Sequence, residues 1–227
     1  MDKALSWLAE TLDYRFSDTQ LFEQSLTHRS YRGASNERLE FLGDAVLDFA
    51  VSELVYLAMP DADEGDLSRL RASLVKDTSL AELAAELGLG QHLNLGSGER
   101  KSGGHRRESI LADALEALFG AVFLDAGFEA SKQIIEKAFG DRLLNLPDPR
   151  DLLDPKTRLQ EWLQARQMGL PDYSLLKISG EAHRQKFEIR CAVTGEVAET
   201  TGTGSSRRNA EQQSAERMLS VLTSADE

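Results

Sequence analysis

Apolar residues recur at intervals of three and four along most of the first two thirds of the chain. This spacing predicts amphipathic helices over 37–58, 66–87, 108–125 and 129–144. Alternating β-branched runs are scarce in the same region. Residues 1–145 are therefore predicted to form an all-α domain.

Three of the five prolines, Pro147, Pro149 and Pro155, fall in one short window. Proline interrupts both helices and strand ladders, so residues 146–153 are predicted to be a linker. Beyond it the hydrophobic period changes, and residues 154–224 are predicted to form a small α+β domain with the order α-β-β-β-α. Its expected elements are a helix at 156–167, strands at 173–180, 187–193 and near 196–202, and a helix at 207–223.

The strand at 187–193 has the clearest pattern of the second domain. Every second residue from Phe187 to Val193 is apolar, as in a strand with one buried face. Cys191 belongs to this apolar set and is predicted to be a core residue. The dipeptide Thr194-Gly195 predicts a tight turn into the next strand.

Charge is distributed unevenly between the two predicted domains. The chain has 26 Lys and Arg against 38 Asp and Glu, for a formal net charge of -12. Taken alone, this balance argues against a nucleic-acid partner. However, residues 1–153 hold 16 basic and 27 acidic residues, whereas residues 154–227 hold 10 and 11. Because the second domain is nearly neutral, the net charge of the whole chain does not exclude nucleic acid.

Composition excludes several classes of protein. There is no run of about 18 apolar residues, so no membrane span is expected, and the N-terminus lacks the apolar core of a signal peptide. A single cysteine, Cys191, excludes an internal disulfide and a Cys-rich zinc site. The four histidines are far apart, so any metal would be a hard cation on oxygen ligands. The chain is predicted to be cytoplasmic.

The segment Glu37–Leu47, with the sequence ERLEFLGDAVL, carries the most informative pattern. On a helix, Glu37, Glu40 and Asp44 fall within an arc of about 60°. Like charges at this spacing are unfavourable, and Gly43 costs about 1 kcal/mol relative to Ala in a helix. The glycine suggests that another element packs closely here. The opposite, core-facing side is predicted to carry Leu39, Leu42, Val46 and Phe49.

A second predicted helix repeats this arrangement. Asp113 and Glu116 stand one turn apart, beside the small residues Ala117 and Gly120. If the two acidic faces met, up to five carboxylates would share one cleft, which a divalent cation such as Mg²⁺ or Mn²⁺ would make tolerable. A solvated acidic helix face gives the same spacing, so the pattern alone leaves both interpretations open.

The stretch Glu37–Leu47 resembles the signature of the ribonuclease III family. The blocks Leu26–Ser30, Asp63–Asp66 and Glu108–Asp113 flank it in the order found in that family. The resemblance extends over essentially the whole chain. It implies a homodimeric endoribonuclease that cuts double-stranded RNA with Mg²⁺, with Mn²⁺ as a substitute and no organic cofactor.

The resemblance also implies roles for individual carboxylates. Glu40, Asp113 and Glu116 match metal ligands, and Asp44 matches a residue that acts with Glu116 in catalysis. Carboxylate-held Mg²⁺ can neutralise phosphate charge and lower the pKa of water. In-line attack of water on phosphorus would then leave 5′-phosphate and 3′-hydroxyl ends, as in the family.

Further positions of the first domain are assigned by the same resemblance. Glu37 and Glu64 match acidic positions that support RNA or water contacts. Phe41 matches a residue that packs across a two-fold dimer interface. His28 is predicted to be structural rather than catalytic. The basic loop Lys101–Arg107 could contact phosphate or be a solvated connection.

In its α-β-β-β-α order and in the segments Asp154–Glu161, Gly180–His183 and Gly202–Gln212, the second domain resembles a double-stranded RNA-binding domain. Such domains recognise the A-form shape of the duplex through its minor grooves and the phosphates between them. Ser205 or Ser206 is predicted to cap the last helix. Glu211 stands where many such domains carry a lysine, which should weaken autonomous RNA binding. The RNA contacts implied by the resemblance are Thr157, Gln160, Glu161, His183, Ser205, Ser206, Arg207 and Arg208.

Together these observations predict a catalytic domain at 1–145, a linker at 146–153 and an RNA-binding domain at 154–224. The expected substrates are ribosomal, transfer and messenger RNA precursors. One alternative is a non-catalytic binder of double-stranded RNA, which would not need the acidic cluster. A second is a metal phosphohydrolase for small substrates, which would not need the C-terminal domain.

Overall fold

The computed structural model describes residues 2–181, 184–194 and 198–224. The chain divides into two compact units, Met1–Pro149 and Arg150–Glu227. The division lies within the predicted linker, where a short 3-10 helix, η3, spans Pro149–Leu152. None of the helices in the described part of the chain has the length and apolar character needed to cross a membrane.

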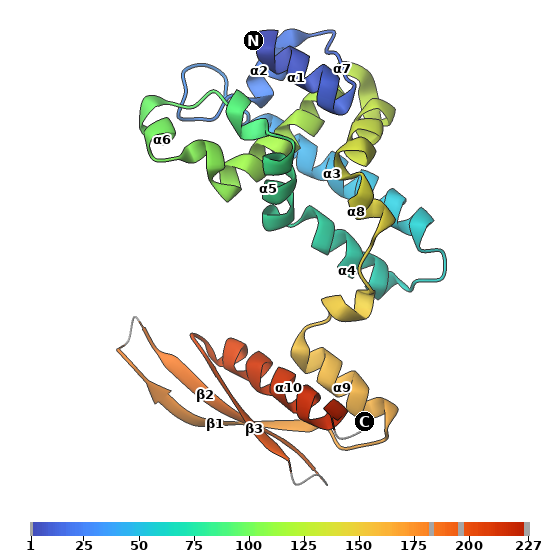
Figure 1. The fold of residues 1–227 in the computed structure, drawn as a ribbon, viewed down its shortest axis with the longest axis vertical. Coiled ribbons are helices and arrows are strands. Elements are labelled where there is room, and N and C mark those ends of the chain that lie inside the picture. Colours follow the sequence, from blue (N-terminus) through green and yellow to red (C-terminus); the bar gives the residue numbers. More distant parts are fainter. Residues whose placement is uncertain (1, 182–183, 195–197, 225–227) are drawn as a thin grey trace. The chain divides into compact units, whose positions relative to one another are not determined.

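The first unit is built of helices (Figure 1), as predicted. Within its described residues, strand pairing is limited to one isolated parallel bridge between Thr27 and Asn94. The α-helices are α1 (Asp2–Leu12), α2 (Thr19–Ser25), α3 (Glu37–Ala58), α4 (Glu64–Val75), α5 (Asp77–Glu86), α6 (Ser97–Lys101), α7 (Glu108–Phe139) and α8 (Asp141–Leu144). Two short 3-10 helices are η1 (Leu89–His92) and η2 (Gly104–Arg106).

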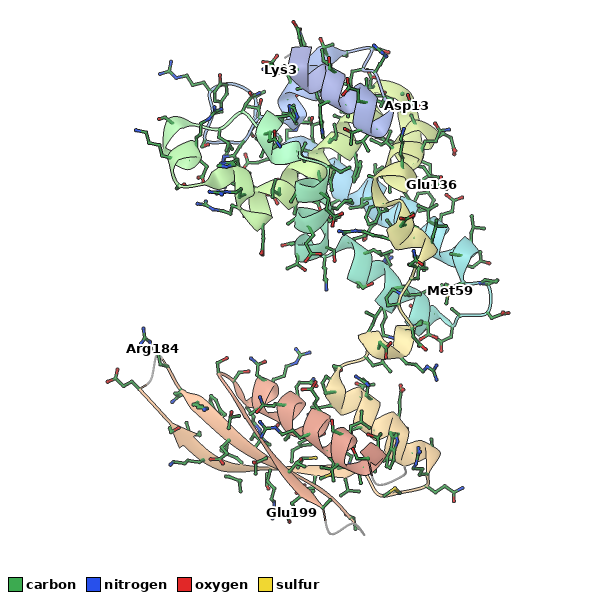
Figure 2. All side chains as sticks on the ribbon, viewed as in Figure 1. Lys3, Asp13, Met59, Glu136, Arg184 and Glu199 are labelled. Carbon is green, nitrogen blue, oxygen red and sulfur yellow. The ribbon has the colours of Figure 1, made fainter. Side chains whose placement is uncertain are left out.

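Helix α7 is the central element of this unit. Ile110, Leu111, Ala112, Leu115 and Phe119 are all buried, as are most of their neighbours up to Val122. Helices α3, α5 and α2 pack against it, and side chains fill the space between these helices (Figure 2). The two segments predicted to carry the acidic faces, on α3 and α7, are therefore direct neighbours.

The segment predicted as one helix over 66–87 forms two helices. Lys76 has extended backbone angles, φ -62° and ψ 147°, and separates α4 from α5. The break allows α5 to pack against α7 with its own apolar side, which includes the buried Leu80 and Leu83. Leu70 and Leu74 of α4 are also buried. The two apolar sides thus face different neighbours, which a single straight helix could not achieve.

The break predicted between 125 and 129 is a kink within α7. Gly127 has φ 84° and ψ -176°, a combination that is open to glycine alone. The helix then continues to Phe139 rather than to residue 144. Gly140, with φ 46°, ends it, and the short α8 follows.

Phe49 does not face the core, and this part of the prediction for α3 is wrong. The residue is 62% exposed and packs against Phe128, with ring centroids 4.9 Å apart. Leu39 and Val46 are buried as predicted, and Leu42 is half-buried. Helix α3 therefore has a second apolar side that points to solvent.

The second unit has the predicted order α-β-β-β-α. It comprises α9 (Pro155–Ala165), β1 (Pro171–Ser179), β2 (Lys186–Val193), β3 (Glu199–Gly204) and α10 (Arg207–Ser224). The strands form an antiparallel sheet in the order β1-β2-β3, and α9 and α10 cover one of its faces (Figure 1).

The core of the second unit lies between the sheet and its two helices. Cys191 is fully buried there, as predicted, together with residues such as Leu159, Leu163, Val193 and Met218. The predicted turn at Thr194-Gly195 reaches beyond the described residues.

Strand register places the β1–β2 loop near the start of α10. Ser179 pairs with Lys186 at the loop, and Phe187 pairs with Gly204, just before α10 begins. Figure 2 labels Arg184 at this end of the sheet and Glu199 at the other. The residues that flank this loop therefore lie at the same end of the sheet as the start of α10.

Candidate metal centre and nucleic-acid interface

The two acidic helices cross in close contact at a pair of glycines. A Cβ atom on Gly43 of α3 would lie 1.8 Å from the backbone oxygen of Glu116 on α7. A Cβ atom on Gly120 would lie 2.3 Å from the backbone oxygen of Leu39. Real Cβ atoms do not come within 3.0 Å of other heavy atoms, so any other residue would push the helices apart. The glycine that costs helix stability thus permits the crossing that joins the two acidic faces.

Three carboxylates meet at this crossing. Glu40 of α3 and Asp113 and Glu116 of α7 each offer one oxygen, and these oxygens lie within 4.8 Å of one another. All three residues are half-buried. Hard divalent cations such as Mg²⁺ prefer carboxylate oxygens in this kind of arrangement. In the part of the chain that the structure describes, this is the only acidic, His or Cys group with that geometry.

Without a cation, the negative charges of this cluster are unfavourable, because the carboxylates are partly buried and close together. Burial raises the pKa of Glu116 to about 8, and repulsion from Asp44, Asp113, Glu40 and Asp77 adds to the effect. Burial also raises the pKa of Glu40 and of Asp113. These shifts mean that the folded chain disfavours the charged forms. A bound divalent cation would remove this penalty, so the donor set fits a metal ion.

Two further carboxylates act on this cluster from outside it. Asp44 lies one turn beyond Glu40 on α3 and is exposed, and after burial it is the largest contributor to the raised pKa of Glu116. Asp77, at the start of α5, raises the pKa of Asp113 and Glu116. Asp77 was missed by the sequence analysis because only the fold brings α5 beside α7.

A cleft of about 480 Å³ opens beside the carboxylates and includes Glu37, Glu40 and Asp113 in its lining. Its lining also carries cations. Arg29 lies 3.6 Å from Glu37, and Arg107 lies 2.7 Å from Glu99 in ion pairs. The cleft therefore combines acidic groups with positive charge that could face a phosphate backbone.

Two segments singled out in the sequence contribute to this lining. His28 accepts a hydrogen bond at Nδ1 from the backbone N–H of Ser30 at 3.2 Å, and it lines the cleft together with Asp113. Arg107 ends the basic loop and precedes α7. Arg29 and Glu99 were not identified from the sequence, although Arg29 lies in the same block as His28.

The two supporting carboxylates occupy different places. Glu37 lines the cleft and accepts a hydrogen bond from the Ser35 hydroxyl at 3.0 Å. Glu64 begins α4, after the loop that follows Met59 (Figure 2), and accepts a hydrogen bond from Ser68 at 2.9 Å. Helix α3 has 22 residues and is about 33 Å long. Within one chain, the structure brings Glu37 but not Glu64 to the acidic cluster.

Phe41 lies on an exposed apolar strip of α3. It is 82% exposed, and Phe49 and Tyr56 continue the strip along the helix. Phe41 also borders a hollow of about 600 Å³ whose lining includes Leu42 and Leu124. Burial of these exposed apolar side chains against a partner would be favourable, because it removes apolar surface from water.

In the second unit, one of the two serines predicted to cap α10 forms the capping hydrogen bond. Ser206 accepts a hydrogen bond from the backbone N–H of Asn209 at 3.1 Å and is the capping residue. Ser205 accepts from the side-chain amide of Asn209 at 3.3 Å. Arg207 and Arg208 follow in the first turn of α10, and both are exposed.

Helix α9 presents the other predicted contacts. Gln160 and Glu161 are exposed. The Thr157 hydroxyl donates to Asp154 at 2.9 Å, so it serves the cap of α9. His183 lies outside the described residues.

Comparison with known proteins agrees with this division of the chain. A family model described as Ribonuclease-III-like matches residues 18–143, and one described as Double-stranded RNA binding motif matches residues 155–222. The chain is 56% identical to Ribonuclease 3 of Dechloromonas aromatica over 215 residues, covering 95% of this chain and 97% of the relative. It is 51% identical to Ribonuclease 3 of Nitrosococcus oceani over 229 residues, covering 100% of this chain and 98% of the relative.

A solved structure supports the fold of the first unit. The nuclease domain of ribonuclease III from Campylobacter jejuni superposes with a TM-score of 0.57 and 46% sequence identity. The match covers 60% of this chain and 98% of that chain, which is described as flexible in a region involved in dimer formation. Given the domain matches and the identity over nearly the full length, the chain belongs to the ribonuclease III family and is a double-strand-specific endoribonuclease.

Proposed function

We propose that this endoribonuclease uses Mg²⁺, held by Glu40, Asp113 and Glu116, to hydrolyse duplex RNA. The observation that carries the proposal is the approach of their three carboxylate oxygens to within 4.8 Å at the crossing of α3 and α7. When bound, Mg²⁺ would neutralise phosphoryl charge and make water more acidic. Mn²⁺ shares the preference for oxygen ligands and would substitute.

The chain's own residues support hydrolysis in specific ways. Asp44 is exposed beside Glu116, and its carboxylate oxygens would accept the proton that the attacking water loses. The water oxygen forms a bond to phosphorus while the bond from phosphorus to the 3′ oxygen breaks. The released 3′ oxygen takes up a proton, so the products carry 5′-phosphate and 3′-hydroxyl ends. Glu37 and Glu64 would support water and RNA contacts.

The cations of the cleft would orient the cut strand. Arg29 and Arg107 are half-exposed or more in their ion pairs, and guanidinium groups form strong hydrogen bonds to phosphate. Because the carboxylates repel an RNA backbone, such cations would offset part of that repulsion. This interpretation favours phosphate contact over a purely solvated role for the loop Lys101–Arg107.

We also propose that the active form is a homodimer joined through Phe41. The exposed strip of α3 and the neighbouring hollow support this proposal, because each copy offers both an aromatic side chain and an apolar recess. A two-fold interface pairs the same surface from each copy. Two acidic clusters would then be available, one for each strand of the duplex.

The second unit would hold the duplex through both of its helices. We assign RNA contacts to Gln160 and Glu161 of α9 and to Arg207 and Arg208 of α10. The further proposed contacts are Thr157, His183, Ser205 and Ser206. Precursors of ribosomal, transfer and messenger RNA, in the cytoplasm, remain the proposed substrates and location.

The test is cleavage of a long RNA duplex by the full chain. With Mg²⁺ we expect cleavage to short fragments that carry 5′-phosphate and 3′-hydroxyl ends, and with EDTA we expect none. Single-stranded RNA of the same sequence and a DNA duplex serve as substrate controls. Equal cleavage in EDTA would overturn the role of Mg²⁺, and ends of the opposite kind would overturn the mechanism.

A further inference from the structure

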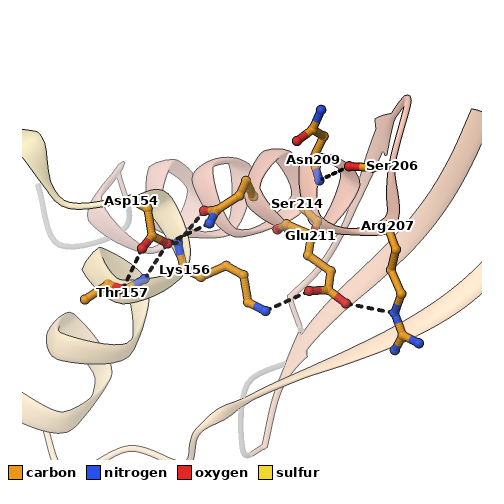
Figure 3. Close-up of polar contacts among 9 residues, drawn as sticks. Asp154, Lys156, Thr157, Ser206, Arg207, Asn209, Glu211 and Ser214 are labelled. Atoms are coloured by element: carbon orange, nitrogen blue, oxygen red, sulfur yellow. Dashed lines mark hydrogen bonds and ion pairs between the residues drawn. The ribbon is translucent and has the colours of Figure 1, made fainter. Parts of the chain in front are cut away.

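Glu211, in the second turn of α10, joins two cations from different helices. Its Oε1 accepts a hydrogen bond from Nε of Arg207 at 3.0 Å, and its Oε2 accepts one from Nζ of Lys156 at 2.7 Å (Figure 3). The Glu211 side chain is only 14% exposed. Both oxygens of a nearly buried carboxylate are thus engaged by α9 on one side and by the start of α10 on the other.

This network is well fixed. Lys156 and Arg207 together lower the pKa of Glu211, so the carboxylate remains charged throughout the neutral range. The ammonium group of Lys156 also lies 4.5 Å from the centre of the Tyr173 ring, an attractive cation–π arrangement. Lys156 is therefore fixed by two interactions, one with Glu211 and one with the Tyr173 ring, and it fixes the Glu211 carboxylate in turn.

The contact with Glu211 engages only one nitrogen of the Arg207 guanidinium group. Only Nε, the nitrogen nearest the side-chain stem, bonds to Glu211, and within the described residues Nη1 and Nη2 of Arg207 form no hydrogen bond. The side chain is 62% exposed. Arginine–carboxylate pairs are frequently bidentate, with two guanidinium nitrogens engaged in the fork geometry, whereas here the second oxygen of Glu211 is bonded to Lys156. Here the two terminal nitrogens point away from Glu211 and are free to bind one phosphate.

The Gln212 side chain forms a second link between α9 and α10 in the same region. The Gln212 side-chain amide donates to Asp154 at 2.7 Å, and its oxygen accepts from the backbone N–H of Lys156 at 3.0 Å. This link joins the start of α9 to the second turn of α10 without involving the side chains of Glu211, Arg207 or Lys156. This second link makes it possible to separate packing from the orientation of Arg207.

We propose that Glu211 is a positioning residue that orients Arg207 toward the phosphates of duplex RNA. The inference rests on the proposed RNA contact of Arg207. An unrestrained arginine loses rotamer freedom when it binds, which costs about two- to tenfold in affinity. Glu211 restrains the side chain in advance, so the acid at a position that often carries lysine would strengthen binding rather than weaken it.

The test measures binding of the full chain to a short RNA duplex in EDTA, at several salt concentrations. We expect Glu211→Gln to raise the Kd about fivefold. Glu216→Gln removes the same charge from an exposed position of α10 and should change the Kd less than twofold. Against an Arg207→Gln background, which itself has a raised Kd, Glu211→Gln should have no further effect.

Each other result overturns the inference. A lower Kd for Glu211→Gln would mean that the acid only attenuates a basic surface. Gln212→Ala breaks the second link between α9 and α10 without changing the net charge, and a rise in Kd equal to that of Glu211→Gln would assign the effect to packing. A raised Kd for Arg207→Gln with none for Glu211→Gln would refute this inference alone. An unchanged Kd for Arg207→Gln would refute the proposed RNA contact as well.

Discussion

Substitution of Gly43 by alanine tests whether the helix crossing sets the geometry of the acidic cluster. The added Cβ would lie 1.8 Å from the backbone oxygen of Glu116, whereas real contacts begin near 3.0 Å. Local separation of α3 and α7 by about 1 Å is therefore required to relieve the overlap. Glu40 moves with one helix and Asp113 and Glu116 with the other, so their 4.8 Å cluster would widen.

Two energies oppose each other in this variant. Alanine favours a helix over glycine by about 1 kcal/mol, whereas overpacking costs about 1–3 kcal/mol. The net loss of stability is therefore at most about 2 kcal/mol, or a few degrees in Tm. A misplacement of about 1 Å in a catalytic site can cost about 10²-fold in rate. We expect activity to fall much further than stability.

The assay compares cleavage of an RNA duplex with Mn²⁺ binding by calorimetry. Gly43→Ala should cleave about 10²-fold more slowly than the parent and bind Mn²⁺ more weakly, while it remains folded at the assay temperature. Gly98→Ala is the matched control, because its Cβ meets nothing within 4 Å. Parental cleavage and parental Mn²⁺ affinity in Gly43→Ala would refute the argument that the close crossing positions the carboxylates.

Glu116 gives two further predictions, and other parts of the molecule give two more. Burial raises the pKa of Glu116 to about 8, so a metal ion must displace a proton from it below that pH. The apparent Mn²⁺ affinity should therefore rise by up to about tenfold per pH unit from pH 6 to 8. An affinity that does not change with pH would contradict this. The same shift means that the folded chain binds more protons than the unfolded chain, so stability of the metal-free protein should fall over that range. Phe41→Ala should weaken dimers by about 2 kcal/mol or more in sedimentation, and unchanged dimers would exclude its proposed role. Asp125 accepts hydrogen bonds from the Tyr14 hydroxyl at 2.6 Å and from the backbone N–H groups of Ser17 at 3.0 Å and Asp18 at 2.8 Å. Asp125→Ala removes this acceptor, so the free energy of unfolding, measured by thermal unfolding, should fall by about 2 kcal/mol.

The helical periodicity predicted α3 well because its buried side repeats over six turns. It failed at Lys76, where no proline or glycine marks the break and the change of direction depends on contacts with α7. It also failed at Phe49, because α3 has two apolar sides and the pattern alone cannot tell core from exposed surface. The place where a helix breaks and the side of it that is buried depend on tertiary packing, which overrides local preference.

The candidate site was predictable to a similar degree. The spacing of Glu40, Asp113 and Glu116, together with Gly43, indicated two acidic faces that could meet, and the structure brings these three carboxylates together. Arg29, Glu99 and Asp77 come from other segments, and for Glu99 and Asp77 nothing in the local sequence points to the cluster or its cleft. Their contribution depends on loop and helix placement, which is set by long-range contacts.

The most direct test of the central claim is single-turnover cleavage of duplex RNA by Glu116→Gln over a range of Mg²⁺ concentrations. The substitution keeps the shape of the side chain but removes the charge of a carboxylate at the centre of the cluster. Glu108→Gln, at the exposed start of the same helix, is the matched control. The account predicts a rate at least about 10²-fold lower for Glu116→Gln with duplex binding retained, and a parental rate for Glu108→Gln. A parental rate for Glu116→Gln would contradict the assignment of this cluster as the catalytic metal site.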